Sequence, residues 1–231
     1  MKLTDIVGKY KTDKQDPHQY LETYEKYFSN YKDRLDVKKV VEIGVSFGDS
    51  LLMWAEYFPN AEIIGADILD FEKSEYMVNF GGILTDRGIL RDHPRISVYQ
   101  LDQTDLESLK RFKSNIGEDC DILIDDGGHS MEMHQKTLKT LLPVIKSSGL
   151  YVIEDLHTCY AGFDNILYGF PLIQEGDTVT TMLLADLHRP KSIIPDTNYI
   201  NKDEMIDIRN NITKVEVARC KISEISFIEK K

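Results

Sequence analysis

Short apolar runs alternate with amphipathic stretches along most of this chain. The runs are rich in β-branched residues and short enough to be buried strands, and they cover 37–44, 62–66, 95–101, 121–125 and 149–153. The stretches between them place apolar residues at helical spacing over 51–58, 106–112 and 130–146. This order predicts parallel strands joined by helices. Two alternating runs near the end, 213–219 and 224–229, predict an antiparallel hairpin.

We therefore expect one α/β domain over 1–231, with a Rossmann-like sheet that is mostly parallel and ends in an antiparallel hairpin. Residues 1–36 carry an aromatic stripe at helical spacing and predict an N-terminal helical cap. Residues 156–211 show no clear period. A loop of that length predicts a lid or a substrate-binding insertion.

Carboxylates follow two of the predicted strands. Asp125 and Asp126 end one strand, and Glu154 and Asp155 end the next one along the chain. A parallel crossover brings both ends to the edge where open α/β sheets bind ligands. Asp126, Glu154 and Asp155 could converge there on a hard cation such as Mg²⁺. Either cluster taken alone could instead be a solvated loop start.

The first predicted strand runs into a glycine turn. Gly44 and Gly48 bound it, and Asp67 ends the next strand 19 residues after Gly48. This spacing is typical of a dinucleotide-binding unit, but Ser46 stands where that motif has its second glycine. A nucleoside ligand without a pyrophosphate fits better, and S-adenosylmethionine (SAM) is the obvious one. Its ribose would pair with Asp67 and its methionine end would lie against the turn.

Polar residues at two further strand ends complete the predicted cofactor site. Asp102 and Gln103 are candidates to bind the adenine edge, and Asp125 is a further candidate for the cofactor site. We expect Asp49 or Ser50 to cap the helix after the glycine turn, and Thr104 or Asp105 to cap the helix over 106–112.

Charge and composition exclude several classes of partner. The net charge of −11 argues against a nucleic acid, because binding its phosphates needs clustered Lys and Arg. The chain has no apolar run long enough to span a bilayer and no signal-peptide core at its start. The three cysteines have no metal-ligand spacing and predict reduced thiols. We expect a cytoplasmic protein without a membrane partner.

Four segments carry a more specific resemblance. They read Lys9-Tyr10 with Thr12-Asp13-Lys14, Val41-Glu42-Ile43-Gly44-Val45, Asp125-Asp126-Gly127-Gly128-His129 and Tyr151-Val152-Ile153-Glu154-Asp155-Leu156-His157-Thr158. In these segments the chain resembles the metal-dependent sugar O-methyltransferases of macrolide-antibiotic tailoring, the mycinamicin and tylosin pathway enzymes and their bacterial relatives. The resemblance implies a class I SAM-methyltransferase sheet and methyl transfer from SAM to a sugar hydroxyl.

The resemblance also implies roles for single residues. The matching positions for Mg²⁺ are Asp126, Glu154 and Asp155, and the proposed base is His129, with the metal-bound Asp126 as the alternative. Independently of the resemblance, we expect Glu42 to organise the glycine turn or to bind the methionine end of SAM. We expect His157 to support the site rather than to act in the reaction.

Several alternatives stay open at this stage. The acceptor could be a nucleotide-activated hexose or heptose for surface polysaccharide, a glycosylated natural product, or a catechol-like diol. A nucleotide-sugar would need basic residues near its pyrophosphate, and the candidates are Arg87, Arg91, Arg189 and Lys191. Rival classes are an NAD-dependent oxidoreductase and a catalytically silent SAM-binding protein. A homodimer or a higher homo-oligomer is also possible.

Overall fold

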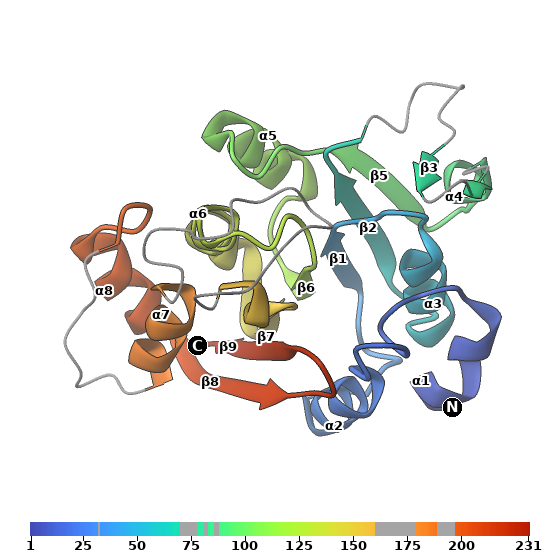
Figure 1. Ribbon diagram of the computed structural model, residues 1–231, viewed down its shortest axis with the longest axis horizontal. Coiled ribbons are helices and arrows are strands. Elements are labelled where there is room, and N and C mark those ends of the chain that lie inside the picture. Colours follow the sequence, from blue (N-terminus) through green and yellow to red (C-terminus); the bar gives the residue numbers. More distant parts are fainter. Residues whose placement is uncertain (32, 70–77, 81–82, 86–87, 160–178, 189–196) are drawn as a thin grey trace.

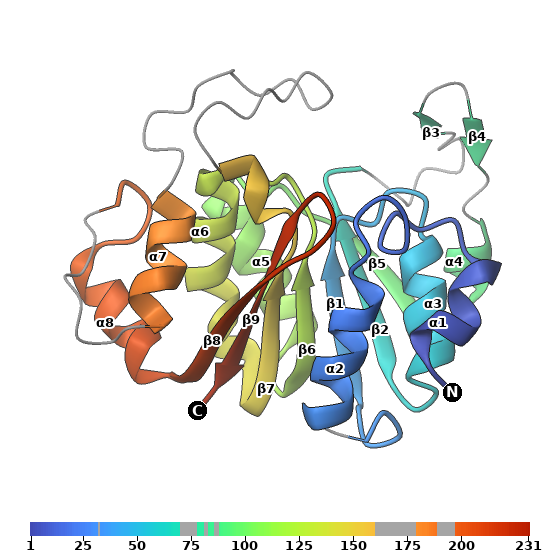
Figure 2. The ribbon, with the colours of Figure 1, turned by 60° about the horizontal axis from the view of Figure 1, so that its bottom comes forward.

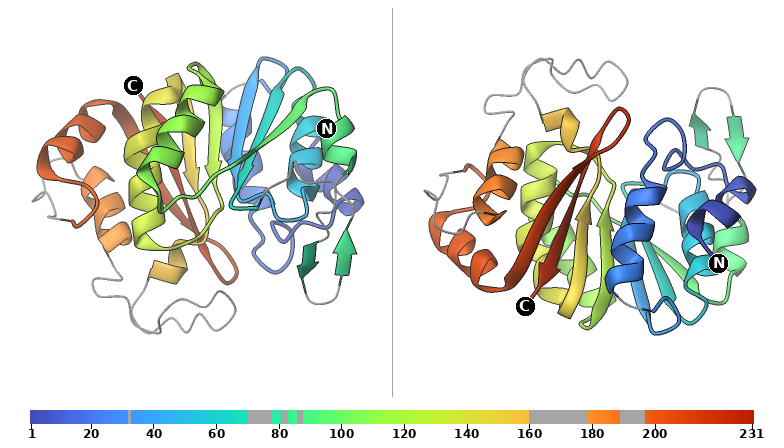
Figure 3. Two further views of the ribbon diagram at one scale, coloured as in Figure 1. Left: turned by 90° about the horizontal axis from the view of Figure 1, so that it is seen from above. Right: turned by 90° about the horizontal axis from the view of Figure 1, so that it is seen from below.

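A seven-stranded sheet with the strand order β5-β2-β1-β6-β7-β9-β8 organises the chain in the computed structural model (Figure 1). The structure describes residues 1–31, 33–69, 78–80, 83–85, 88–159, 179–188 and 197–231. The strands are β1 Lys39–Ile43, β2 Glu62–Asp67, β5 Ile96–Gln100, β6 Cys120–Asp125, β7 Ile145–Ile153, β8 Ile212–Arg219 and β9 Glu224–Lys230. A separate antiparallel pair, β3 Val78–Phe80 and β4 Ile83–Thr85, stands away from this sheet (Figure 3).

The five strands β5, β2, β1, β6 and β7 are parallel, and β9 pairs antiparallel with both β7 and β8. This confirms the mostly parallel sheet with a C-terminal hairpin. The chain leaves β1 toward β2 on one side, and β6 lies on the other side of β1. The β1–β6 pair is therefore the topological switch point, where open α/β sheets bind ligands.

Helices cover both faces of the sheet. They are α1 Leu3–Ile6, α2 Leu21–Tyr31, α3 Asp49–Tyr57, α4 Gly88–Asp92, α5 Leu106–Ile116, α6 Met131–Leu141, α7 Val179–His188 and α8 Lys202–Asn210, with short 3₁₀ turns at Val7–Lys9, Leu142–Val144 and Leu156–Cys159. Alternate strand residues enter two separate cores. For example, Val40 packs with residues of α1 to α4, and its neighbour Val41 packs with residues of α5 to α8.

Two boundaries differ from the sequence-based prediction, and a third agrees with it. Helix α6 ends at Leu141, and Ile145, which the pattern placed in the helix, begins β7. Pro143 explains this, since proline cannot continue a helix. Neither Asp49 nor Ser50 caps α3, because Gly48 is the N-cap residue and has a positive φ of 82°. The start of α5 is as predicted. Asp105, one of the two expected caps, is the N-cap residue, and its carboxylate accepts a hydrogen bond from the Glu107 N–H.

The expected irregular segment 156–211 contains two α-helices in its described part. Helix α7 buries Leu183, Leu184 and Leu187 against the sheet. Helix α8 begins with a capping box in which Asn201 and Glu204 satisfy each other's backbone N–H groups. The expectation that this segment forms a lid or an acceptor wall depends on 160–178 and 189–196, which lie outside the described residues.

The N-terminal cap predicted for 1–36 is helical only in part. A loop over 10–20 separates the 3₁₀ turn at Val7–Lys9 from α2. Figure 2 shows this loop at the carboxyl edge of the parallel strands, on the same edge as the β8–β9 turn. The loop therefore lies where the sequence predicts the ligand site.

Candidate active site

The glycine turn after β1 lies directly against the turn after β6. Gly44 has a φ of 90°, which favours glycine, and a Cβ atom there would collide with the carbonyl oxygen of Asp126. The Asp126 N–H in turn donates to the carbonyl oxygen of Ile43 at 2.9 Å. The predicted cofactor turn and the first predicted acidic cluster are thus one packed unit.

Asp67 holds the glycine turn from the neighbouring strand β2. Its Oδ2 atom accepts hydrogen bonds from the N–H groups of Val45 and Ser46, both at 2.9 Å, and Oδ1 accepts one from the Leu69 N–H at 3.0 Å. Asp67 also lines the cavity above the turn. It therefore shapes the turn in addition to facing the place predicted for a ribose.

Glu42 also supports the turn, from within β1. The side chain is fully buried, and its Oε2 atom accepts a hydrogen bond from the Ser50 hydroxyl at 2.7 Å. This contact joins β1 to the first turn of α3. Of the two roles that the sequence left open for Glu42, organising the glycine turn is the one that the described contacts support.

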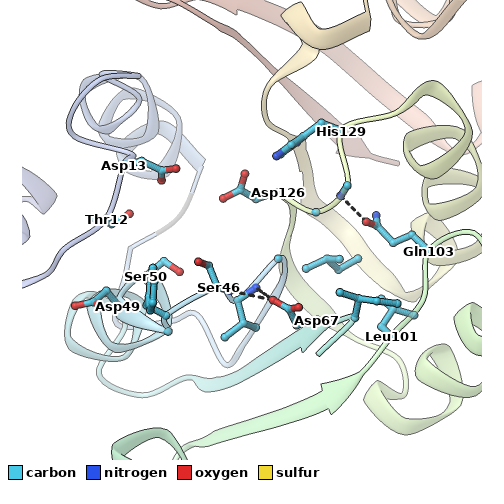
Figure 4. Close-up of a pocket in the computed structure, with 18 of the residues that line it drawn as sticks. Thr12, Asp13, Ser46, Asp49, Ser50, Asp67, Leu101, Gln103, Asp126 and His129 are labelled. Atoms are coloured by element: carbon cyan, nitrogen blue, oxygen red, sulfur yellow. Dashed lines mark hydrogen bonds between the residues drawn. The ribbon is translucent and has the colours of Figure 1, made fainter. Parts of the chain in front are cut away.

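A cavity of about 520 Å³ opens above this turn. Its walls are the glycine turn 43–50, the ends of β2 and β5 with Asp67 and 101–103, the loop 126–129, and the N-terminal loop 11–14. Figure 4 shows Thr12 and Asp13 across the cavity from Asp126 and His129, with Ser46 and Asp67 on its floor. The cavity is large enough for a nucleoside-sized ligand.

Gln103 and Asp125 hold the loop after β6. The Gln103 amide donates to Asp125 Oδ1 at 2.8 Å and to the Thr137 hydroxyl at 3.0 Å, and its Oε1 atom accepts from the Gly128 N–H at 2.8 Å. Gln103 lines the cavity, whereas Asp125 is fully buried behind the wall. Burial raises the pKa of Asp125 to about 7. Asp102, the other adenine candidate, lines the cavity and accepts hydrogen bonds from Thr104 through its Oδ1 atom.

Asp126, His129 and Asp155 come together at the carboxyl ends of β6 and β7. One ligand atom from each lies within 4.8 Å of the other two, so the three could share a cation. The His129 Nε2 atom is 3.5 Å from Asp155 Oδ2. Burial lowers the pKa of His129, although Asp155 opposes the shift, so the ring is neutral at pH 7. A neutral imidazole here can accept a proton or bind a metal.

Glu154 lies beside this group but faces the N-terminal segment. Its Oε1 atom accepts hydrogen bonds from the Lys14 ammonium at 2.7 Å and from the Tyr24 hydroxyl. Lys14 also donates to Asp126 Oδ2 at 2.6 Å. Burial raises the pKa of Glu154 to about 7, against the lowering effect of Lys14. Of the three predicted metal ligands, Asp126 and Asp155 thus lie in one group with His129. Glu154 is not in that group, and the Lys14 ammonium lies between it and Asp126.

Asp155 is surrounded by aromatic side chains. Its Oδ1 atom accepts a hydrogen bond from the Tyr20 hydroxyl at 2.6 Å and lies 3.4 Å from His18 Nδ1 and 3.8 Å from His157 Nδ1. Burial would raise the pKa of Asp155, but His129 and the other histidines outweigh it and lower the pKa below the ordinary value. Asp155 is therefore ionised at pH 7. His157 thus lies near Asp155, and its supporting role stays a prediction.

Sequence reasoning missed the part that the N-terminal segment plays. The aromatic stripe with Tyr20 and Tyr24 predicts a helix but no contact with the acidic site, and the segment with Lys14 has no role assigned from the sequence. The tyrosine hydroxyl groups could have indicated this role. A buried tyrosine hydroxyl needs a hydrogen-bond partner, and Tyr20 and Tyr24 are four residues apart, a spacing that puts both on the same side of a helix. The lysine gave no such signal, because most lysines in polar loops are exposed.

Comparisons with known proteins agree with this geometry. Residues 41–156 match the family described as "Methyltransferase domain". The chain is 34% identical over 165 residues to the 8-demethyl-8-alpha-L-rhamnosyl tetracenomycin-C 2'-O-methyltransferase of Streptomyces olivaceus, a match that covers 68% of this chain and 38% of that protein. It is also 34% identical over 166 residues to the mycinamicin VI 2''-O-methyltransferase of Micromonospora griseorubida, covering 68% of this chain and 37% of that protein.

A solved structure resembles the whole chain. The MycE methyltransferase from the mycinamycin biosynthetic pathway, in complex with Mg and SAH, superposes with a TM-score of 0.72 at 28% identity, covering 100% of this chain and 53% of that protein. The chain thus spans well under half of the two sequence relatives and about half of this structure. Among the described residues, no helix is long and apolar enough to cross a membrane. With its switch-point cavity, its sheet order and the match over 41–156, the chain belongs to the methyltransferase-domain family.

Proposed function

We propose that this chain transfers the methyl group of SAM to a sugar hydroxyl with the help of a divalent cation such as Mg²⁺. The observation that carries the proposal is the contact between Gly44 and Asp126, which puts the cofactor turn, Asp126 and His129 around one cavity. A methyl donor bound at the turn and an acceptor bound at the carboxylates would therefore meet. The named activities of the sugar O-methyltransferase relatives support the same reading.

The cofactor would lie along the turn after β1. Asp67 offers its carboxylate to a ribose, and Asp102 and the end of β5 line the cavity where an adenine would lie. Gly44, Ser46 and Gly48 leave room for the methionine end close to the main chain. These residues bind and orient the donor, which matters because an in-line methyl transfer depends on alignment.

The donor set at the carboxyl ends of β6 and β7 fits a hard cation. Asp126, Glu154 and Asp155 would hold it through oxygen atoms, which Mg²⁺ prefers. Such a cation, when bound, would act as a Lewis acid toward the acceptor hydroxyl. Within the described residues, the donors of the N-terminal segment reach Asp126 Oδ2 and Glu154 Oε1, so each of these carboxylates keeps a second oxygen for a ligand role.

His129 is the proposed base. The ring is 5% exposed, neutral at pH 7 and 3.5 Å from Asp155, which would stabilise the imidazolium after proton transfer. The acceptor hydroxyl gives its proton to His129 as its oxygen forms the bond to the methyl carbon. The carbon–sulfur bond of the donor breaks in the same step and leaves the neutral thioether.

The acceptor we propose is a sugar on a glycosylated small molecule, as in the names of the tetracenomycin and mycinamicin relatives. A nucleotide-sugar remains the alternative. Of its four basic candidates, Arg91 is exposed on α4, and Arg87, Arg189 and Lys191 lie outside the described residues. Membership of the methyltransferase-domain family removes the support for an NAD-dependent oxidoreductase.

The test is methyl transfer from labelled SAM to three acceptor sets: rhamnosylated polyketides, nucleotide-sugars and catechols. Each set is assayed with Mg²⁺ and with EDTA. We expect turnover on the first set that EDTA stops and Mg²⁺ restores. Turnover on catechols alone would overturn the sugar assignment, and turnover that persists in EDTA would overturn the cation. SAM binding is measured separately by calorimetry, so that a missing acceptor is not mistaken for a missing donor site.

A further inference from the structure

Lys14 is a buried lysine at the centre of the acidic site. Its side chain is 1% exposed, although it belongs to a loop without regular secondary structure. The ammonium contacts one carboxylate from each of three neighbouring strands: Glu42 in β1 at 3.2 Å, Asp126 after β6 at 2.6 Å and Glu154 after β7 at 2.7 Å. Lysines are almost never fully buried unless they are paired. The three contacts therefore explain how this one can be.

The three carboxylates offset the cost of burying the Lys14 ammonium, because each of them has an oxygen atom within 3.2 Å of the Lys14 Nζ atom. The same ammonium reduces the repulsion between the two carboxylates that it bridges. Without it, the half-buried Asp126 and the buried Glu154 would be neighbouring like charges that repel each other.

Lys14 contacts only one oxygen atom of each carboxylate that it bridges, which leaves the other oxygen to bind a cation. Lys14 binds Asp126 through Oδ2 and Glu154 through Oε1. The remaining oxygen of each group is not used by the N-terminal segment. The ammonium thus fixes the orientation of both side chains while one oxygen atom of each can still bind a cation.

The loop that carries Lys14 is itself anchored on both sides of the cavity. The Lys11 N–H donates to Asp49 Oδ1 at 3.0 Å, at the start of α3. On the other side, the Tyr20 hydroxyl donates to Asp155. Residues 11–14 form one wall of the cavity, and Figure 4 shows Thr12 and Asp13 facing it. The segment therefore touches the cofactor turn and the acidic site at the same time.

We propose that Lys14 is a positioning residue that couples the cofactor pocket to the cation site. Through Glu42 it touches the strand that ends in the glycine turn, and through Asp126 and Glu154 it sets the cation ligands. Docking of the N-terminal loop then completes both sites together. This inference deepens the proposed function and rests on it.

A second possible role for Lys14, as a substitute for the cation, predicts the opposite effect on metal binding. If the ammonium stood in the place of the cation, the two would compete, and removing Lys14 would tighten metal binding. If Lys14 positions the ligands, removing it lets Asp126 and Glu154 move apart, and metal binding weakens. The two arrangements therefore differ in the sign of one measurable quantity.

The experiment measures Mn²⁺ affinity by electron paramagnetic resonance and SAM affinity by calorimetry, without any acceptor, in the full chain. We expect Lys14→Met, which keeps the length of the side chain, to weaken Mn²⁺ at least tenfold and SAM several-fold. Lys14→Arg, which keeps the charge, recovers part of the Mn²⁺ affinity. Lys26→Met is the matched control, because Lys26 is exposed on α2, and it leaves both affinities unchanged. Hydrogen exchange of residues 10–20 reports loop docking and rises in Lys14→Met.

A fold control keeps the test decisive. Should Lys14→Met fail to fold, Lys14→Met combined with Glu154→Gln removes one of the three carboxylate charges that the ammonium paired, and loop exchange is then measured in that variant. Unchanged or tighter Mn²⁺ binding in a folded Lys14→Met protein would overturn the inference, as would a loop that stays protected. A wild-type chain that binds neither Mn²⁺ nor SAM would instead overturn the proposed function, so the two failures are distinct.

Discussion

Gly44 and Asp126 pack so closely that the main chain of one turn forms the floor of the other. A side chain at Gly44 would need both a left-handed backbone and the space that the Asp126 carbonyl group occupies. The contact joins the two turns at the switch point of the sheet. It therefore fixes the distance between a donor at the glycine turn and an acceptor at the carboxylates.

We expect Gly44→Ala to abolish SAM binding and to lower the free energy of unfolding by roughly 3 kcal/mol, from backbone strain and from the collision. Calorimetry and urea unfolding measure the two effects. Gly117→Ala is the matched control, because Gly117 also has a positive φ of 65° but has nothing within 4 Å of an added Cβ atom. It should cost about 1 to 2 kcal/mol and leave SAM binding unchanged. Equal SAM affinities in the two variants would contradict the inference that the contact between Gly44 and Asp126 shapes the SAM site.

The general architecture could be predicted from the sequence because it depends on repeated local patterns. The β-branched runs of β1 and β6 and the apolar spacing of α5 specify buried strands and amphipathic helices wherever they occur. The acidic strand ends followed from the crossover rule, which places successive parallel strands with their carboxyl ends at one edge. Such features need no knowledge of distant contacts.

The support of the site depends on distant contacts, about which the local sequence pattern carries little information. Lys14 meets Asp126 and Glu154 across more than a hundred residues of chain, and no local pattern reports such a meeting. Asp67 was expected to face a ribose, yet it also holds the turn through two N–H groups. The start of α8 was different, since the Asn201 and Glu204 spacing is a readable capping box.

Asp126→Asn should abolish turnover while leaving SAM bound. The change keeps the shape of the side chain but removes the charge that a divalent cation needs, so we expect a loss of at least about 1000-fold in kcat. SAM affinity should change by no more than about threefold, because the cofactor is expected to lie along the glycine turn. Labelled-SAM turnover and calorimetry measure the two quantities. Glu107→Gln, at an exposed site on α5, serves as the control. A parallel loss of SAM affinity would argue against Asp126 as a cation ligand.

His129→Gln separates two roles that the geometry allows. As the base, His129 should contribute a factor of about 10² to 10⁴ to kcat, and its loss should leave Mn²⁺ affinity nearly unchanged. As a ligand beside Asp126 and Asp155, its loss should weaken Mn²⁺ binding as well. We expect the first result. Mn²⁺ titration followed by electron paramagnetic resonance decides between them, and a tenfold weaker titration would reassign His129 to the metal.

His134 should make the stability of the protein depend on pH. The ring is fully buried, its Nδ1 atom lies 3.6 Å from the Cys159 sulfur, and burial lowers its pKa to about 3. Below its ordinary pKa of about 6.5, the unfolded chain takes up a proton that the folded chain does not, so stability falls as the pH falls toward 3. His134→Leu removes this difference in proton uptake between the unfolded and the folded chain. Between pH 6 and pH 4, the wild type should lose up to about 1.4 kcal/mol per pH unit relative to the variant. Urea unfolding at pH 7, 6, 5 and 4 measures the difference, in which the titrating carboxylates common to both proteins cancel. Parallel stability curves for the two proteins would mean that His134 takes up its proton equally well in the folded state.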